Sequence, residues 1–252
     1  MAGIEGHNRL ILGSSGSGKS EYLKRVILAY QDRAEFRVML NTSREMRELF
    51  AHSEVLTMED EGKTYAPEKL AALIRHHGSV HFECAAGPQI AGFVEALCQA
   101  LFLLGEYDAD RLICVLFGDE IQRFFPKGGS GIQPMPPAAV RLETEGRKYG
   151  LGVVKATQNL TNPDGLGLSI HALKQLTSVT VFCLVELNQQ ERVMRLFPAI
   201  PNPGQLRRPD RAKGHPPECV VLDVQLGRVL RVNVDPATGA RTASWLIGEP
   251  TT

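Results

Sequence analysis

Short apolar runs of strand length alternate along the chain with segments whose apolar residues recur at helical spacing. The runs are rich in β-branched residues and almost continuously apolar, which is typical of strands buried on both faces. They lie at residues 9–12, 37–40, 80–84, 112–117, 153–157 and 179–185. The helical segments lie at residues 19–31, 67–77, 88–104, 138–149 and 188–197. This alternation predicts an α/β fold in which a mostly parallel sheet carries helices on both faces.

The rhythm changes towards the C-terminus. Residues 198–217 are rich in proline and carry a cluster of Arg and Lys. Two alternating segments, 219–223 and 228–233, follow and are joined by a short turn, which predicts a β-hairpin. We therefore expect one main domain over residues 1–205, with a basic loop and a short hairpin at residues 206–252 packed on it.

Composition excludes fibrous, disordered and disulfide-stapled proteins. The 252 residues are 43% hydrophobic and 22% charged, which is sufficient for one large core. Five cysteines form no C-x-x-C pair and lie mostly in apolar runs, so we expect free thiols in a reducing compartment. A glycine-rich turn precedes any apolar stretch of signal-peptide length, and polar residues interrupt segment 88–104. These features predict a cytoplasmic protein with no transmembrane segment of its own.

A glycine-rich segment after the first predicted strand matches the pattern G-x-x-x-x-G-K-[S/T], and a predicted helix follows it. Glycines in this loop let backbone N–H groups surround a β-phosphate, and the helix N-terminus adds positive potential. Lys19 offers a cation to the β- and γ-phosphates, and Ser20 offers a hydroxyl to Mg²⁺. We therefore expect ATP and Mg²⁺ as cofactors. The nucleotide-binding residues predicted are Gly13, Ser14, Ser15, Gly16, Ser17, Gly18, Lys19 and Ser20.

Two adjacent carboxylates, Asp119 and Glu120, follow the apolar run 112–117. By themselves they are compatible with a helix N-cap. After a phosphate loop they predict a hydrolytic site in which Asp119 holds the Mg²⁺ shell and Glu120 deprotonates the attacking water. A kinase acting on a small molecule needs no such water-activating carboxylate, and the Asn-Lys-x-Asp guanine signature of GTPases is absent from the sequence. ATP hydrolysis is the reaction favoured.

Gln158 lies at the end of the predicted strand 153–157, where ligands bind in sheets of this type. A glutamine there can hydrogen-bond the γ-phosphate or the attacking water. Spacing alone supports this interpretation and an ordinary polar strand end equally.

The phosphate loop, the Asp119–Glu120 pair and the stretch 145–160 (EGRKYGLGVVKATQNL) together resemble the FtsK/HerA superfamily of motor ATPases. The resemblance covers about residues 8 to 200. It implies a RecA-like P-loop fold with an additional strand and a catalytic glutamate, and a hexameric ring with ATP between subunits. It further implies that Gln158 is the sensor glutamine and that Arg147 acts as a catalytic arginine finger in the next subunit's site. The alternative for Arg147 is a surface residue at a helix C-terminus, where a cation is favourable in any case.

The short chain lacks the large extra modules of many members of the superfamily, which favours the genome-packaging ATPases of membrane-containing icosahedral viruses. We expect translocation of double-stranded DNA into a preformed capsid, with a capsid vertex or a membrane protein as partner. Alternatives are a cellular HerA-like helicase, a protein-secretion or pilus motor, and a non-catalytic nucleotide-binding module. DNA stimulation of ATP turnover separates the DNA motors from the protein motors.

Net charge does not point to nucleic acid, because 28 Lys and Arg residues balance 28 Asp and Glu residues. The balance excludes a protein that coats nucleic acid but permits local, sequence-independent phosphate contacts on loops. Both basic loops are also compatible with ordinary solvated surface. The candidate DNA-binding residues are Lys127 in the Gly- and Pro-rich segment 126–137, and Arg207, Arg208, Arg211 and Lys213.

Overall fold

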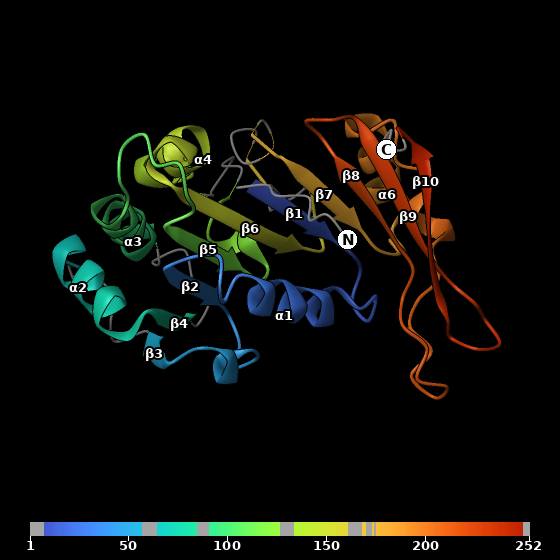
Figure 1. Ribbon diagram of the computed structural model, residues 1–252, viewed down its shortest axis with the longest axis horizontal. Coiled ribbons are helices and arrows are strands. Elements are labelled where there is room, and N and C mark those ends of the chain that lie inside the picture. Colours follow the sequence, from blue (N-terminus) through green and yellow to red (C-terminus); the bar gives the residue numbers. More distant parts are fainter. Residues whose placement is uncertain are drawn as a thin grey trace.

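The computed structural model describes residues 8–56, 65–84, 91–126, 134–160, 168–169, 173 and 175–248. In these residues, ten strands form one sheet in the order β10-β9-β8-β7-β1-β6-β5-β2-β4-β3 (Figure 1). The strands are β1 (Asn8–Leu12), β2 (Phe36–Asn41), β3 (His52–Leu56), β4 (Ser79–Cys84), β5 (Cys114–Gly118), β6 (Leu151–Thr157), β7 (Ser178–Val181), β8 (Cys219–Asp223), β9 (Arg228–Val234) and β10 (Arg241–Ile247). The α-helices are α1 (Lys19–Ala29), α2 (Pro67–His77), α3 (Ala91–Leu104), α4 (Pro137–Glu145) and α6 (Leu187–Leu196). Single 3₁₀ turns are η1 (Arg47–Leu49), η4 (Ile121–Arg123), η5 (Gly146–Tyr149) and η6 (Pro203–Gln205).

All strands from β7 to β3 in the sheet order run parallel, and β8, β9 and β10 continue the same sheet in antiparallel fashion. Strand β6 lies between β1 and β5, so the strand before the phosphate loop does not contact the strand before Asp119. The parallel register brings the ends of β1 and β6 level, with Leu12 opposite Thr157. This order confirms the mostly parallel α/β fold with an additional central strand.

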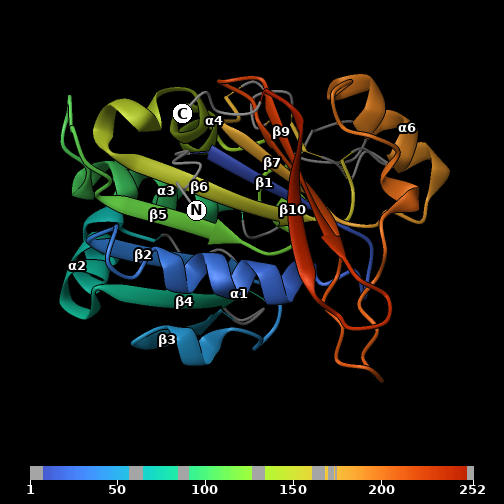
Figure 2. The same cartoon turned by 45° about the vertical axis from the view of Figure 1, so that its right-hand side comes forward.

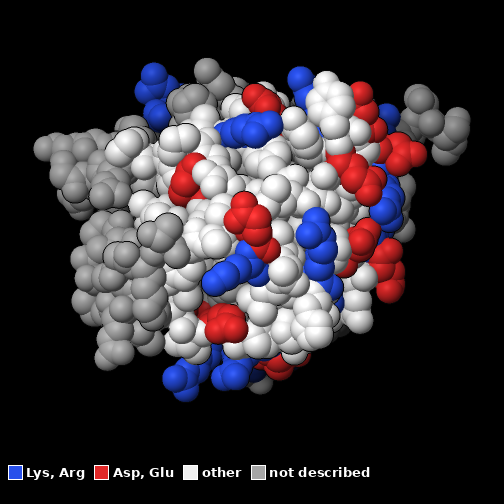
Figure 3. All heavy atoms as spheres, turned by 90° about the vertical axis from the view of Figure 1, so that its left-hand side faces the viewer, with Lys and Arg blue, Asp and Glu red and all other residues white. Residues whose placement is uncertain are grey.

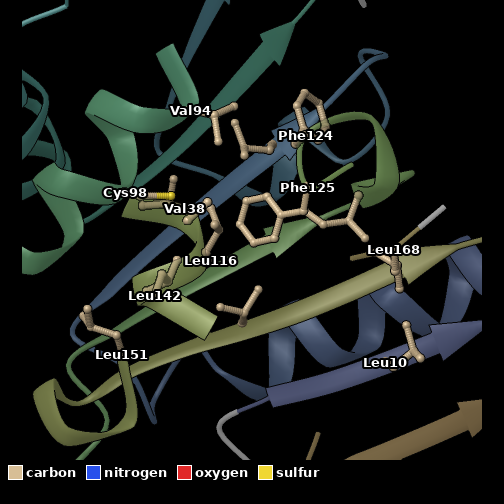
Figure 4. Packing of buried hydrophobic residues seen from close by; sticks show 14 of the residues in the cluster. Leu10, Val38, Val94, Cys98, Leu116, Phe124, Phe125, Leu142, Leu151 and Leu168 are labelled. Carbon is tan, nitrogen blue, oxygen red and sulfur yellow. The ribbon is translucent and has the colours of Figure 1, made fainter. Parts of the chain in front are cut away.

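Helices cover both faces of the sheet (Figure 2). On one face α1 buries Leu23 and Ile27 against residues of β1, β5 and β6. On the other face α2, α3 and α4 form the larger core, in which α3 buries eight residues from Phe93 to Leu104. Strand residues such as Val38 and Leu116 point into this core (Figure 4). Burying apolar side chains on both faces explains why the central strands are almost continuously apolar in sequence.

Two strands at the sheet edges were not predicted. Strand β3 is only partly buried, and β10 is mostly exposed. Edge strands of this kind do not need the apolar pattern of a buried strand, so periodicity does not reveal them. The predicted C-terminal hairpin is confirmed as β8 and β9, and β10 extends it.

Three predicted boundaries were wrong. The strand expected at 179–185 ends at Val181, and residues 182–185 instead pass beside the phosphate loop. The helix expected at 138–149 divides into α4 and the tighter turn η5. The run expected to be a strand from residue 112 enters the sheet at Cys114. The start of the helix expected at 88–104 lies outside the described residues, and α3 is described from Ala91.

The five cysteines are free and buried, as predicted. Burial raises the pKa of the Cys84 thiol to about 12 and that of Cys219 to about 11, so both remain protonated at neutral pH. Among the described residues, no helix is both long and apolar enough to span a bilayer.

Candidate active site

The predicted phosphate loop connects the end of β1 to the first turn of α1. Gly16 and Gly18 have φ angles of 71° and 96°, a region that glycine enters without steric cost. A Cβ atom on Gly18 would also overlap the ring of Pro217, which lies against the loop. Backbone conformation therefore favours glycine at both positions, and close packing adds to this at Gly18.

Neighbouring segments hold the loop in place. The Ser14 N–H donates to the Cys183 carbonyl at 3.1 Å, and the Val185 N–H donates to Ser14 Oγ at 2.9 Å. Within the loop, Ser17 N–H donates to the Ser14 carbonyl at 3.1 Å. The Ser17 side chain is fully buried, and its Oγ has no hydrogen-bond partner among the described residues. A buried hydroxyl without a protein partner inside such a loop fits the binding of a phosphate oxygen.

Buried Lys19 and Asp119 form a cluster with partly buried Glu120 at the carboxyl ends of the parallel strands. Lys19 Nζ lies 2.6 Å from Asp119 Oδ1 and 3.1 Å from Glu120 Oε1. Burial alone would lower the pKa of Lys19, but the two carboxylates outweigh it and raise that pKa. Burial would raise the pKa of Glu120, but Lys19 and hydrogen bonds from Gln122 and Gln158 lower it. At neutral pH Lys19 is therefore a cation and Glu120 an anion.

Asp119 has one oxygen available to another ligand. The ammonium of Lys19 and the N–H of Glu120 both contact Asp119 Oδ1, the latter at 3.1 Å. No hydrogen bond to Oδ2 is found among the described residues. A carboxylate oxygen and a serine hydroxyl are hard oxygen donors of the kind that Mg²⁺ prefers. Asp119 and Ser20 thus have the donor chemistry expected of a Mg²⁺ site.

Gln158 reaches the same cluster from the end of β6. Its Nε2 donates to Glu120 Oε1 at 2.9 Å. Glu120 itself lies in the turn after β5, with φ 50° and ψ 45°. A left-handed conformation is uncommon outside glycine and concentrates at functional sites. The polar ends of β5 and β6 are therefore in direct contact, although they lie far apart in the sequence.

Arg147 lies at the amino ends of the parallel strands, opposite the carboxyl ends that carry the cluster. It belongs to η5, directly before β6, whereas Gln158 directly follows β6. The seven residues of β6 separate the two by about 20 Å at the usual rise of a strand. Arg147 is exposed, and no salt bridge to it is found in the described part of the chain. The arginine therefore does not reach the phosphate loop of its own chain.

The basic residues after α6 lie on a hairpin-like loop that extends from the sheet beside β8–β10 (Figure 1). An antiparallel bridge between Asp210 and His215 closes the loop. Arg207, Arg208 and Arg211 are all exposed, but the Arg207 guanidinium donates to the Val234 carbonyl at 3.1 Å. Lys213 lies 4.0 Å from Asp210, and Lys127 lies outside the described residues. For the Arg208 and Arg211 side chains, no hydrogen bond or ion pair is found among the described residues.

The opposite end of the molecule carries charges of both signs. Figure 3 shows Lys and Arg side chains interspersed with Asp and Glu over the described part of the face that bears α2 and α3. A balanced net charge therefore does not conflict with a local basic loop elsewhere.

Three residues of the site were missed by sequence reasoning. Gln122 and Thr157 form hydrogen bonds between the ends of β5 and β6, and Pro217 packs against Gly18. Gln122 lies two residues after Glu120, so its proximity was a usable signal. Pro217 is about two hundred residues from Gly18 in sequence, and no pattern connects the two.

Comparison with solved structures finds the same fold in the genome packaging NTPase B204 of Sulfolobus turreted icosahedral virus 2. Its complex with ATP-gammaS has a TM-score of 0.62 and 18% sequence identity, covering 89% of this chain and 95% of B204. The AMPPCP complex has a TM-score of 0.59 and 16% identity, with coverages of 89% and 95%. B204 of Sulfolobus turreted icosahedral virus, a DNA-packaging ATPase, has a TM-score of 0.59 and 17% identity, covering 88% and 95%. No protein-family model matches the sequence, and no curated protein matches it. The resemblance predicted from the motifs is confirmed at the level of the fold.

Proposed function

We propose that this protein is an ATPase that moves double-stranded DNA and packages a viral genome into a preformed capsid. One observation carries the proposal. Lys19, the Asp119–Glu120 pair and Gln158 meet within hydrogen-bonding distance at the carboxyl ends of the parallel strands, next to the predicted phosphate loop. The likeness of the whole fold to viral packaging NTPases supports the choice of this motor class over others.

The phosphate loop, Gly13 to Ser20, binds the triphosphate through its backbone N–H groups. Lys19 exchanges its contacts with Asp119 and Glu120 for the β- and γ-phosphates, which leaves Glu120 free to act on water. Ser20 and Asp119 would hold Mg²⁺, whose charge would offset that of the phosphates.

Glu120 is the general base in this proposal. The water oxygen forms a bond to the γ-phosphorus, and the bond from that phosphorus to the β–γ bridging oxygen breaks. The water proton passes to Glu120, and the products are ADP and inorganic phosphate. Gln158, which donates to Glu120 in the structure, would orient the same water.

Arg147 serves the neighbouring subunit. Arg147 is exposed at the amino ends of the strands, away from its own phosphate loop, which supports a role across an interface. In a hexameric ring each ATP would lie between one subunit's Lys19 and the next subunit's Arg147. The guanidinium then neutralises charge developing on the transferred phosphoryl group.

DNA contacts would come from loops lining the ring's channel. Arg208 and Arg211 are the best-placed cations on the loop after α6, because both are exposed and neither has a side-chain partner among the described residues. Arg207, Lys213 and Lys127 complete the proposed set. A capsid vertex or a viral membrane protein would hold the ring, which would work in the host cytoplasm or at the virion vertex.

Charge reversal on this loop tests the DNA contact. We expect Arg208→Glu and Arg211→Glu to reduce the stimulation of ATP turnover by duplex DNA, with turnover in the absence of DNA retained. The logarithm of affinity falls linearly with the logarithm of salt concentration, and each lost phosphate contact should make this slope less steep by about 0.9. The measurement is phosphate release over a DNA titration at several salt concentrations. Lys69→Glu, an equivalent change on the exposed face of α2, is the control. An equal loss of ATP turnover in the presence and in the absence of DNA would show that the loop is structural.

A further inference from the structure

Gln122 links Glu120, in the turn after β5, to Thr157 at the end of β6, directly before Gln158. It lies in η4, is 5% exposed, and forms two side-chain hydrogen bonds. Its Nε2 donates to Glu120 Oε2 at 2.7 Å, and its Oε1 accepts from Thr157 Oγ1 at 2.5 Å. A buried glutamine with both ends of its amide paired is held in one orientation.

The chemistry of the partners fixes which way the amide points. An ionised carboxylate only accepts hydrogen bonds, so the NH₂ end of Gln122 must face Glu120. The oxygen end then faces Thr157, whose hydroxyl donates its proton to it. The N–H of Asn159 donates to the same hydroxyl oxygen at 3.0 Å. The result is a directed chain from the backbone after β6 through Thr157 and Gln122 to Glu120.

The turn that carries Gln122 is itself anchored. The side chains of Ile121, Phe124 and Phe125 are buried in the core beneath α3 and α4, and the two phenylalanines appear in Figure 4. The Arg123 N–H donates to the Glu120 carbonyl at 3.0 Å. Gln122 therefore reaches Glu120 from a turn whose neighbouring side chains are anchored in the core.

The two oxygens of Glu120 have different partners. Oε1 contacts Lys19 and Gln158. When triphosphate and water bind, these two groups would turn to them and leave Oε1. Oε2 contacts Gln122, whose other partner belongs to the sheet and not to the nucleotide. The contact to Gln122 is therefore the one that can persist through the catalytic cycle.

We propose that Gln122 is a positioning residue, which holds the Glu120 carboxylate in the orientation needed to activate water and links it to the end of β6. This inference rests on the proposed ATPase function. It implies that Gln122 affects turnover and not nucleotide binding, because its two side-chain hydrogen bonds in the described part of the chain go to Glu120 and Thr157 and not to the phosphate loop.

Gln122→Met removes both hydrogen bonds and keeps a side chain of similar length. We expect kcat to fall by about 10- to 100-fold, since small displacements of a catalytic group cost rates of this order. Affinity for a non-hydrolysable ATP analogue should stay within about 2-fold, because the binding groups are untouched. Gln99→Met is the matched control, since Gln99 also donates to a glutamate, Glu95, at 2.8 Å but on the surface of α3. Wild-type kcat in the Gln122 variant would overturn the inference.

The Glu120→Gln background separates positioning from general loss of structure. If Gln122 acts through Glu120, adding Gln122→Met to Glu120→Gln should lower single-turnover hydrolysis by less than about 2-fold. A further fall as large as that in the wild-type background would also overturn the inference.

Thr157→Val provides a second variant that keeps the shape of the strand end. It removes the hydroxyl that orients Gln122, and we expect a smaller fall in kcat that is not additive with Gln122→Met. Additive losses would contradict a shared chain of hydrogen bonds. The proposed function fails separately, if the wild-type protein does not hydrolyse ATP or if Glu120→Gln leaves hydrolysis intact.

Discussion

The Glu120→Gln protein is expected to bind ATP at least as tightly as the wild type and to hydrolyse it about 10²- to 10⁴-fold more slowly. The amide has the shape of the carboxylate but cannot take a proton from water. Removing the negative charge also releases Lys19, which lies 3.1 Å from Glu120 Oε1, to contact phosphate. Phosphate release and binding of a fluorescent ATP analogue measure the two properties separately.

Glu35→Gln is the control for this substitution. The Glu35 carboxylate forms an exposed pair with Arg111 at 3.0 Å, away from the phosphate loop. Exposed ion pairs contribute little to the free energy of unfolding, so the control should fold and hydrolyse ATP normally. Turnover by the Glu120 variant within about 3-fold of the wild type would remove Glu120 from the role of general base.

Arg147→Ala is expected to lower turnover about 10³- to 10⁵-fold, and only because the arginine is lost from a neighbour's site. Lys19→Ala should be inactive for a different reason, since it disrupts the subunit's own phosphate site. Mixing the two variants creates some interfaces with an intact Lys19 on one side and an intact Arg147 on the other. We therefore expect the mixture to regain turnover that neither variant shows alone.

Lys148→Ala is the neighbouring control, because Lys148 is also an exposed cation of η5. It should retain normal turnover. If Arg147→Ala is fully active, the arginine has no catalytic role. If the two inactive variants assemble together and stay inactive, Arg147 does not act across the interface.

The position of the loop between β1 and α1 was predictable from the sequence, while its role in binding phosphate remains a prediction. The phosphate loop is a local motif whose glycines, Lys19 and Ser20 are contiguous, so the chain order alone specifies their arrangement. The Asp119–Glu120 pair and Gln158 follow apolar strands, and parallel strands bring such ends to one edge. Their meeting within hydrogen-bonding distance agrees with that expectation, while their catalytic roles remain predictions.

The missed features depend on contacts between distant segments. Strand β10 is an exposed edge strand, so it carries no apolar alternation by which to recognise it. Pro217 reaches Gly18 only because the C-terminal strands extend the sheet next to β7. Gln122 is near Glu120 in sequence, but its partner Thr157 is known only once β5 and β6 are paired.

The most direct test of the whole proposal is ATP hydrolysis by the purified full chain, with and without duplex DNA, alongside the mass of the particle. The account predicts turnover that requires Lys19 and Glu120, rises on addition of duplex DNA of any sequence, and belongs to an oligomeric ring. Hydrolysis that does not respond to duplex DNA would contradict a DNA motor and favour one that moves protein. Binding of ATP without any hydrolysis in the assembled particle would contradict the motor function itself.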